Sequence, residues 1–230
     1  MDWISFYDFK HSVIYVNARH RDVHYETIAK DIRALVPSPD AVVMDYGCGE
    51  ATSAALVAQA CGHLTLVEAA PNVRAALRER FASNPKMSVM SPDEAAATPD
   101  RSVDMIVLHS VAQYLTAGEL DGMMATFRRL LKPTGTFVLG DIVPPQMASA
   151  WAALSLLKFG AANGFFWAAV GGLIRILVSD YFTLKKTHGL SHYTEADMLA
   201  RLKAAGFAPR RAARNIGHNQ RRMTFLSTPA

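Results

Sequence analysis

Short apolar runs alternate with longer amphipathic stretches through residues 41–143 of the chain. The apolar runs at 41–44, 64–67, 105–108 and 136–139 are bounded by Gly, Pro or acidic residues, a pattern typical of buried parallel strands. Between them, residues 71–81 begin with Pro71 and carry polar side chains on a solvated face, which predicts a helix. Strands that alternate with helices indicate a doubly wound α/β sheet.

We predict one domain over residues 1–230, in four parts. Residues 1–40 form a helical cap, with apolar residues at helical spacing over 25–35. Residues 41–143 form a ligand-binding core. Residues 144–190 break the alternating pattern and are strongly apolar, and residues 191–230 return with a helix and two strands, near 209–214 and 222–227, that form a closing hairpin.

A glycine-rich turn follows the first apolar run. Asp45-Tyr46-Gly47-Cys48-Gly49 lets the backbone turn sharply and admits a ligand close to the main chain. Glu68 ends the next apolar run, 19 residues after Gly49, where its carboxylate can accept hydrogen bonds from both hydroxyls of a ribose. The sequence therefore predicts a nucleoside ligand.

The charge of Asp45 narrows the choice of nucleoside. A dinucleotide fingerprint needs G-x-G-x-x-G and places a pyrophosphate at the helix N-terminus, whereas here an acidic residue precedes G-x-G and Ala51 follows. A carboxylate would repel a pyrophosphate and would favour an ammonium or sulfonium group. The N–H groups that open the helix near Thr52 could bind the carboxylate of the same ligand.

These residues resemble motif I of the class I S-adenosylmethionine-dependent methyltransferases, with Ala51 in place of the third glycine. Residues 104–108 resemble the family's fourth strand, 130–139 its turn into the fifth strand, with Thr134 in place of a glycine, and 192–207 its last helix and exit turn. The resemblance covers residues 41–143 and 191–230. It implies a mostly parallel seven-stranded, Rossmann-like sheet and S-adenosylmethionine as cofactor. The cofactor-binding residues that it implies are Asp45, Tyr46, Gly47, Cys48, Gly49, Glu68, Ala69, Pro92, Asp93, Glu94, His109 and Ser110.

Methyl transfer from a sulfonium is an in-line displacement, so positioning the acceptor provides most of the acceleration. A base is needed only when the acceptor loses a proton. His109 follows the fourth strand, near the place where the family holds the transferable methyl group, and with Tyr114 it is our candidate catalytic residue; a packing role for His109 stays open. Weaker candidates are Asp141, His188, His192 and His218.

The apolar segment predicts two helices that form a lid over the acceptor. Residues 147–178 are rich in Trp, Phe, Leu and Ile, while the uncharged stretch 159–174 is too short for a comfortable membrane span. We expect a hydrophobic acceptor, such as a lipid, quinone or polyketide-like molecule. Packing against the sheet, a homodimer interface and peripheral membrane contact remain alternatives.

Composition adds less. Cys48 and Cys61 are the only cysteines and are expected to be reduced, and no Cys/His spacing indicates a metal. The start of the chain lacks the pattern of a signal peptide, so we expect a cytoplasmic protein. Seven basic and no acidic residues follow Asp197, which suits anionic headgroups better than nucleic acid, because aromatic residues do not interleave with them.

Other functions stay open at this point. The fold could act on a small polar metabolite, serve as a non-catalytic cofactor-binding scaffold, or belong to a nicotinamide-dependent oxidoreductase; Asp45 opposes the oxidoreductase, and the intact pocket motif opposes the scaffold. The acceptor atom, whether O, N or C, cannot be read from these residues.

Overall fold

The structure, a computed structural model, describes residues 3–9, 15–147, 149–177 and 190–230. Seven strands form one sheet in the order β3-β2-β1-β4-β5-β7-β6. The first five are parallel, and β7 runs antiparallel between β5 and β6. Their bounds are β1 Val42–Tyr46, β2 His63–Val67, β3 Met87–Met90, β4 Val103–His109, β5 Leu131–Ile142, β6 Phe207–Arg211 and β7 Met223–Pro229. The doubly wound, mostly parallel seven-stranded sheet is thereby confirmed.

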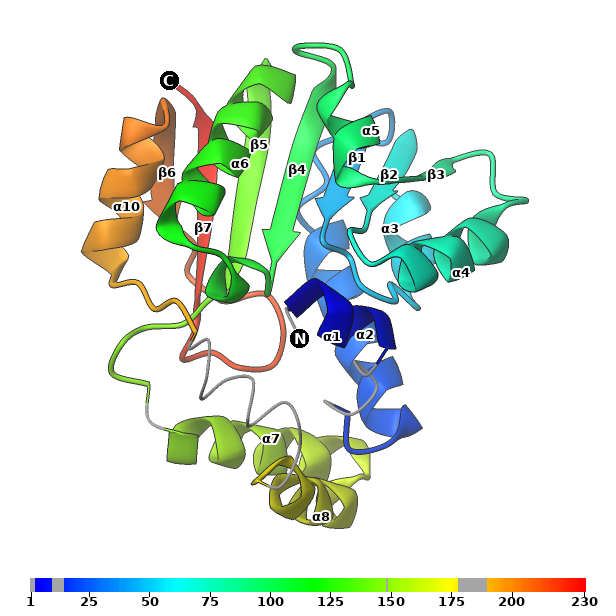
Figure 1. Cartoon of the computed structure of the whole chain (residues 1–230), viewed down its shortest axis with the longest axis vertical. Helices are drawn as coiled ribbons and strands as arrows, with labels where there is room; N and C mark the ends of the chain where they lie inside the picture. Colours follow the sequence, from blue (N-terminus) through cyan, green and yellow to red (C-terminus); the bar gives the residue numbers. More distant parts are fainter. Residues whose placement is uncertain (1–2, 10–14, 148, 178–189) are drawn as a thin grey trace.

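Helices cover both faces of this sheet (Figure 1). Around the sheet lie α2 Ala18–Arg33, α3 Ala54–Ala58, α4 Pro71–Phe81, α5 Pro92–Ala96, α6 Ala117–Leu130 and α10 Glu195–Ala204. A short helix, α1 Trp3–Phe9, contacts α4, and η2 Ala112–Tyr114 follows β4. The predicted helix 71–81 is confirmed at both ends, with Pro71 in its first turn.

Each face of the sheet has its own hydrophobic core. Along β4, Ile106 and Leu108 pack with α6 and α10, whereas Met105 and Val107 pack with α2 and α3. This alternation follows from the period of two in a strand and from burial on both faces. Asp104, at the start of β4, accepts from Val42 N at 2.9 Å and from Lys132 Nζ at 2.8 Å, which joins the amino ends of three adjacent strands.

Two predicted boundaries are wrong by a few residues. The helix expected over 25–35 begins at Ala18, because the side chain of Asn17 caps it by accepting from His20 N at 2.8 Å. The closing strands start at Phe207 and Met223, and Pro209 lies within β6. Proline is tolerated there because β6 is an edge strand.

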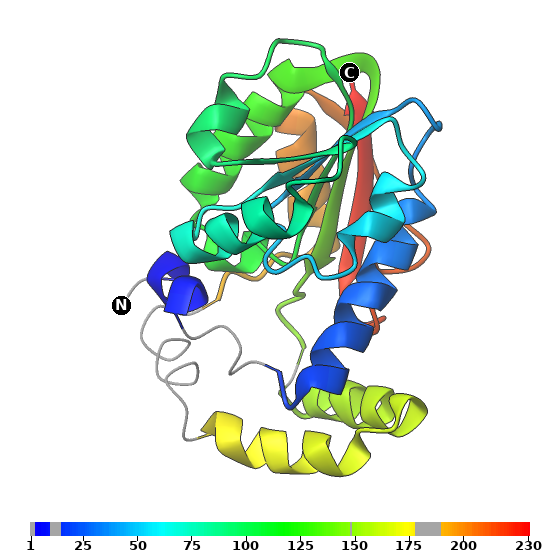
Figure 2. The same cartoon turned by 90° about the vertical axis from the view of Figure 1, so that its right-hand side faces the viewer.

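The predicted two-helix insertion is present as α7 Ser149–Asn163 and α8 Phe166–Leu177. The pair lies beyond the carboxyl ends of the strands, and Figure 2 shows it beside the start of α2, with α8 outermost. We call α7 and α8 the lid. Phe165 and Ala169 are buried inside it against Val16. In the described ranges, no helix has both the length and the apolar character needed to span a bilayer.

The aromatic packing on the α6 face gives a stability prediction. Phe137 is fully buried, with ring centroids 5.2 Å from Phe127 and 5.5 Å from Phe207. Phe137→Ala should lower the free energy of unfolding by about 3 to 5 kcal/mol, because it removes buried area and leaves a cavity. Urea denaturation measures this loss. Phe166→Ala deletes the same ring at an exposed position and should cost about 1 kcal/mol or less; equal losses would contradict the packing described.

Candidate active site

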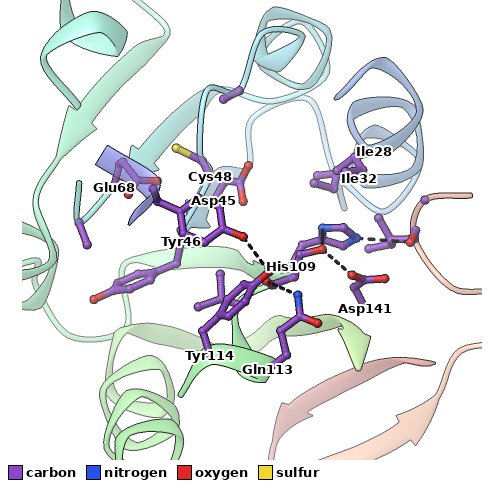
Figure 3. A pocket seen from close by; sticks show the side chains of 18 of the residues that line it. Ile28, Ile32, Asp45, Tyr46, Cys48, Glu68, His109, Gln113, Tyr114 and Asp141 are labelled. Atoms are coloured by element: carbon purple, nitrogen blue, oxygen red, sulfur yellow. Dashed lines mark hydrogen bonds between the residues drawn. The ribbon is translucent and has the colours of Figure 1, made fainter. Parts of the chain in front are cut away.

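A cavity of about 910 Å³ opens at the carboxyl ends of the central strands. Figure 3 shows Asp45 and Glu68 in one part of it and His109 and Asp141 in another, with Ile28 and Ile32 entering from α2. The lining includes most of the residues that the sequence predicts: Asp45, Tyr46, Gly47, Cys48, Glu68, Ala69, Pro92, Asp93, His109, Ser110 and Tyr114. Gly49 and Glu94 are not among the lining residues.

The glycine-rich turn after β1 needs its glycines for both conformation and space. Gly47 has φ +74° and Gly49 φ +60°, in the left-handed region. A Cβ on Gly47 would lie 2.5 Å from Val111 Cγ2, and one on Gly49 would lie 2.7 Å from the hydroxyl of Tyr25. Ala51, at the family's third glycine, also has positive φ, +41°. The substitution of Ala51 for the family's third glycine therefore places an alanine in a strained backbone conformation that favours glycine.

Glu68 organises this turn from the end of β2. Its Oε2 accepts from Gly49 N at 2.8 Å, and its Oε1 accepts from Ala70 N at 2.8 Å. A carboxylate has about four lone-pair sites, so two remain for hydroxyl donors. Gly49 therefore does not line the cavity; its backbone N–H holds the carboxylate of Glu68 in place.

Asp45 supplies negative charge to the cavity, and no cation among the described residues acts on its pKa. Desolvation in the cavity, with repulsion from Glu68 as a smaller cause, raises the pKa of Asp45 to about 7. A positively charged ligand group would relieve both effects. The same surroundings raise the pKa of the Cys48 thiol, because burial, Asp45 and Glu68 all oppose a thiolate.

The cofactor-binding candidates Pro92, Asp93 and Glu94 lie at the start of α5, and only two of them line the cavity. Ser91 caps this helix in a capping box with Glu94, whose Oε2 accepts from Ser91 N at 2.6 Å. Glu94 also pairs with Arg78 at 2.7 Å on the surface. Pro92 and Asp93 point the other way and line the cavity.

Helix α2 forms the wall opposite the glycine-rich turn. The hydroxyl of Tyr25 accepts from Glu50 N at 2.9 Å, so α2 is fastened to the turn. Burial raises the pKa of Tyr25, which keeps the hydroxyl neutral. The sequence placed Tyr25 in a cap without a specific role, because nothing local indicates a contact with residue 50.

His109 belongs to a polar network at the ends of β4 and β5. Its Nε2 lies 3.3 Å from Ile216 O and its Nδ1 lies 3.1 Å from Ser110 Oγ, which donates to Asp141 Oδ2 at 2.6 Å. Arg222 forms an ion pair with Asp141. Ser110 and Asp141 both have left-handed φ, +60° and +66°, which is strain of the kind found at functional sites.

The protonation states in this network follow from burial and charge. Burial lowers the pKa of His109, although Asp141 and the Ile216 carbonyl act in the opposite direction. Burial alone would raise the pKa of Asp141, but Arg222 and His109 bring it below its usual value. His109 is therefore neutral and Asp141 ionised near neutral pH. A neutral imidazole can donate to only one of its two contacts, whereas an imidazolium would satisfy both.

Tyr114 lies under the N-terminal helix. Tyr7 Oη donates to Tyr114 Oη at 2.7 Å, and the Trp3 ring lies 4.5 Å from that of Tyr114. Asn72, at the start of α4, donates to Asp8 through its backbone N at 2.6 Å and its side chain at 2.9 Å. Helix α1 thus covers one end of the cavity.

Histidines form the lid end of the cavity. His20, His24 and His218 line it, with ring centroids 6.0 Å apart between the first two and 6.1 Å between the last two. His20 stacks on Phe165 at 5.0 Å, and His218 stacks on Phe159 at 4.3 Å. Desolvation is the main reason that the pKa falls to about 4 at His20, about 3 at His24 and about 4 at His218. The three imidazoles at the lid end of the cavity are therefore polar but uncharged near neutral pH.

Sequence reasoning named only His218 of these three, because His20 and His24 precede the helix it predicted. Their spacing of four was the available signal, since it places both on one face of α2. Among the other candidates, Asp141 lines the cavity, His192 does not, and His188 lies outside the described residues. Gln113 is a further lining residue; it is buried, and its Oε1 has no hydrogen-bond partner within the described part of the chain.

Comparisons with known proteins agree with this geometry. Residues 43–135 match a family model described as a methyltransferase domain. An uncharacterized methyltransferase of Mycobacterium tuberculosis is 26% identical over 147 residues, which cover 62% of this chain and 70% of the relative, and one from Mycobacterium bovis matches equally. Magnesium protoporphyrin IX methyltransferase from Synechocystis, solved with bound SAM, has a TM-score of 0.62 at 14% identity and covers 98% of this chain and 94% of its own.

The acidic G-x-G turn, the position of Glu68 at the end of β2, the sheet order and the methyltransferase domain matched over residues 43–135 all point to one class of enzyme. The chain is an S-adenosylmethionine-dependent methyltransferase, and its fold and motifs resemble those of class I. S-adenosylmethionine is its cofactor, and the residues around the cavity fit it: Asp45 favours the cationic amino acid part and Glu68 has free acceptor sites for a ribose. The oxidoreductase and scaffold alternatives are thereby set aside.

Glu68 should dominate cofactor affinity. Glu68→Gln replaces one accepting oxygen with a donor and removes charge-assisted hydrogen bonds, each worth about 1.5 to 3 kcal/mol, so S-adenosylmethionine binding should weaken by tens-fold or more. Calorimetry measures this. Glu94→Gln makes the same chemical change at the exposed start of α5 and should leave the affinity unchanged; similar losses in both variants would remove Glu68 from the site.

The raised pKa of Asp45 predicts proton release on cofactor binding. An acid with a pKa near 7 is largely protonated at lower pH, and a cationic ligand stabilises its ionised form. Affinity should therefore rise by up to about tenfold per unit between about pH 5.5 and 7. Calorimetry in buffers of different ionisation enthalpy counts the protons. Asp45→Asn should bind weakly with no such pH dependence, and a wild-type affinity independent of pH would contradict the assignment.

Proposed function

We propose that this enzyme methylates a small hydrophobic acceptor held between the glycine-rich turn and the lid. The observation that carries the proposal is the continuity of the cavity. Asp45 and Glu68 line the same cavity as Ala152 and Leu156 of α7. Its far end is lined by apolar side chains and by imidazoles held neutral, so it offers no charge to a polar metabolite.

S-adenosylmethionine supplies an activated methyl group on a sulfonium, so the protein need only bring the acceptor into line and exclude water. Two helices exclude water from this space. Helix α1 does so where Tyr7 bonds to Tyr114 of η2, and helix α2 does so through Ile28 and Ile32. Gln113 adds a directional contact. Its buried Oε1 can accept from an O–H or N–H of the acceptor.

For a hydroxyl acceptor, the network of His109 can take up the proton. The acceptor oxygen would take the methyl group as the bond from that carbon to the sulfonium sulfur breaks, which leaves the neutral thioether S-adenosylhomocysteine. The hydroxyl proton would pass to Ser110 Oγ, and the proton that Ser110 donates to Asp141 would turn and pass to Nδ1 of His109. The resulting imidazolium donates to Ser110 and to the Ile216 carbonyl at once, and Asp141 balances its charge. Tyr114 positions the acceptor in this scheme and transfers no proton.

His109→Gln tests the base role. Turnover should fall by about 10²- to 10⁴-fold, the usual contribution of a general base, while cofactor affinity is unchanged. The pH profile of kcat should also lose its acidic limb, because that limb reports protonation of His109. His192→Gln, outside the cavity, is the matched control. If His109→Gln keeps normal turnover at all pH values, His109 has a packing role and the acceptor needs no base.

The size of the acceptor end can be tested from α7. Ala152 lines the cavity, so Ala152→Trp should fill it and raise KM for the acceptor at least tenfold, while the affinity for S-adenosylmethionine stays the same. Ala150→Trp adds the same side chain at an exposed position one residue before Trp151 and should have no effect. Loss of cofactor binding in Ala152→Trp would show that this space belongs to the cofactor.

The acceptor itself can be found by incubating the enzyme with lipid and metabolite extracts and a labelled methyl donor, followed by mass analysis. A labelled product soluble in organic solvent supports the proposal, and a polar product contradicts it. We further propose a cytoplasmic enzyme without a nucleic acid partner. Three of the arginines near the end of the chain, Arg201, Arg211 and Arg222, pair with acidic side chains and offer no continuous basic track.

A further inference from the structure

The outer side of the lid exposes large apolar side chains. On α8, Trp167 is 81% exposed and Ile174 is 65% exposed. They are seven residues apart and so share one face of the helix. On α7, Trp151 and Leu154 are 41% and 38% exposed. Because α8 is the outermost helix (Figures 1 and 2), we call Trp167 and Ile174 the outer lid face, and exposed apolar side chains gathered in this way mark interaction sites.

The charges on and around this face are basic. Residues 149–177 contain no Asp or Glu, and their charged residues, Lys158 and Arg175, are both exposed. Two more arginines reach the lid from elsewhere in the fold. The guanidinium of Arg221 lies 3.5 Å from the ring centroid of Trp151, and Arg19 Nε donates to Asn163 O at 3.3 Å.

This arrangement differs from the basic tail that the sequence suggested. Arg201 pairs with Asp121 at 2.6 Å, Arg211 pairs with Glu195, and Arg222 pairs with Asp141. Their charge is largely neutralised within the fold. At the lid, Lys158, Arg19 and Arg221 form no ion pair with a carboxylate of the described part of the chain.

We infer that the outer lid face docks on the surface of a lipid bilayer that contains anionic headgroups. Tryptophan suits such a surface because its ring is amphipathic, and helices that lie in the interface combine Trp, Leu or Ile with Lys or Arg. A second copy of the chain fits less well. Arg175 donates to Val16 O at 2.8 Å, and in a symmetric dimer the same face meets itself, so Lys158 of one copy would find no carboxylate in residues 149–177 of the other.

This surface goes beyond the proposed function, because docking requires neither an occupied acceptor site nor turnover. It would nevertheless bring the lid end of the cavity close to the phase in which apolar molecules collect. Ala152 and Leu156 of α7 line the cavity, and α8, which packs against α7, carries Trp167 and Ile174. The lid therefore has one side toward the acceptor space and another toward the bilayer.

Vesicle flotation tests the docking. Wild-type protein should float with phosphatidylcholine vesicles that contain phosphatidylglycerol, float poorly with phosphatidylcholine alone, and be released by high salt. Trp167→Ser with Ile174→Ser should lower the partition coefficient by about tenfold or more. Lys158→Glu should lower it by roughly tenfold on anionic vesicles only, because it reverses one charge at the surface.

Matched controls distinguish docking from misfolding. Ala75→Ser with Ala76→Ser changes exposed positions on α4, and Lys203→Glu reverses a charge on α10; both should bind vesicles like wild type. Melting temperature and S-adenosylmethionine affinity should be unchanged in every variant. Equal flotation with neutral and anionic vesicles, undiminished binding by the Trp167/Ile174 variant, or a dimer that this variant dissociates would overturn the inference. Failure of docking would leave the proposed acceptor class untouched, since that rests on the cavity.

Discussion

The active site depends on the bridge that Glu68 makes between two loops. One oxygen holds the amide of Gly49 after β1, and the other holds the amide of Ala70 after β2. The strained turn, with three positive φ angles at Gly47, Gly49 and Ala51, is kept in place from the strand next to it. A carboxylate that accepts from the backbone in this way is also oriented before any ligand arrives, so little ordering cost is left for binding.

Charge divides the cavity into two halves. The half near β1 and β2 contains Asp45 and Glu68, whose mutual repulsion and burial favour a cation. The half near the lid contains His20, His24 and His218, which desolvation keeps neutral. The ion pair of Asp141 and Arg222 lies between the β5 end and the 216–222 loop and carries no net charge. The first half therefore favours a cationic group, and the second half favours an uncharged one.

What could be predicted from the sequence was local. Asp45, Gly47 and Glu68 were found because a strand, a tight turn and the next strand are short and contiguous, so their spacing alone places them together. Glu94 was grouped with Asp93 because the direction of a side chain at a helix start depends on the cap, and Ser91 turns Glu94 outward.

The contacts that escaped prediction join distant segments. Tyr25 meets Glu50, His24 meets His218, and Ser110 meets Asp141 only once the sheet and α2 are assembled. Composition predicted two helices after β5, because residues 147–178 are strongly apolar while their uncharged stretch is too short for a comfortable membrane span. It could not tell Phe165, which is buried in the lid, from Phe166 beside it, which is exposed.

The position of β7 in the sheet has a consequence for folding order. Phe137 on β5 pairs with Ser227 on β7, and the whole lid and α10 lie between them in the chain. During synthesis the lid must emerge while β5 still presents an open edge with unpaired amides and carbonyls. Contacts this distant in sequence form slowly, and a partly folded chain would expose that edge together with the apolar lid. A chain cut after α10 would keep every cofactor residue and yet present a sheet edge prone to aggregation.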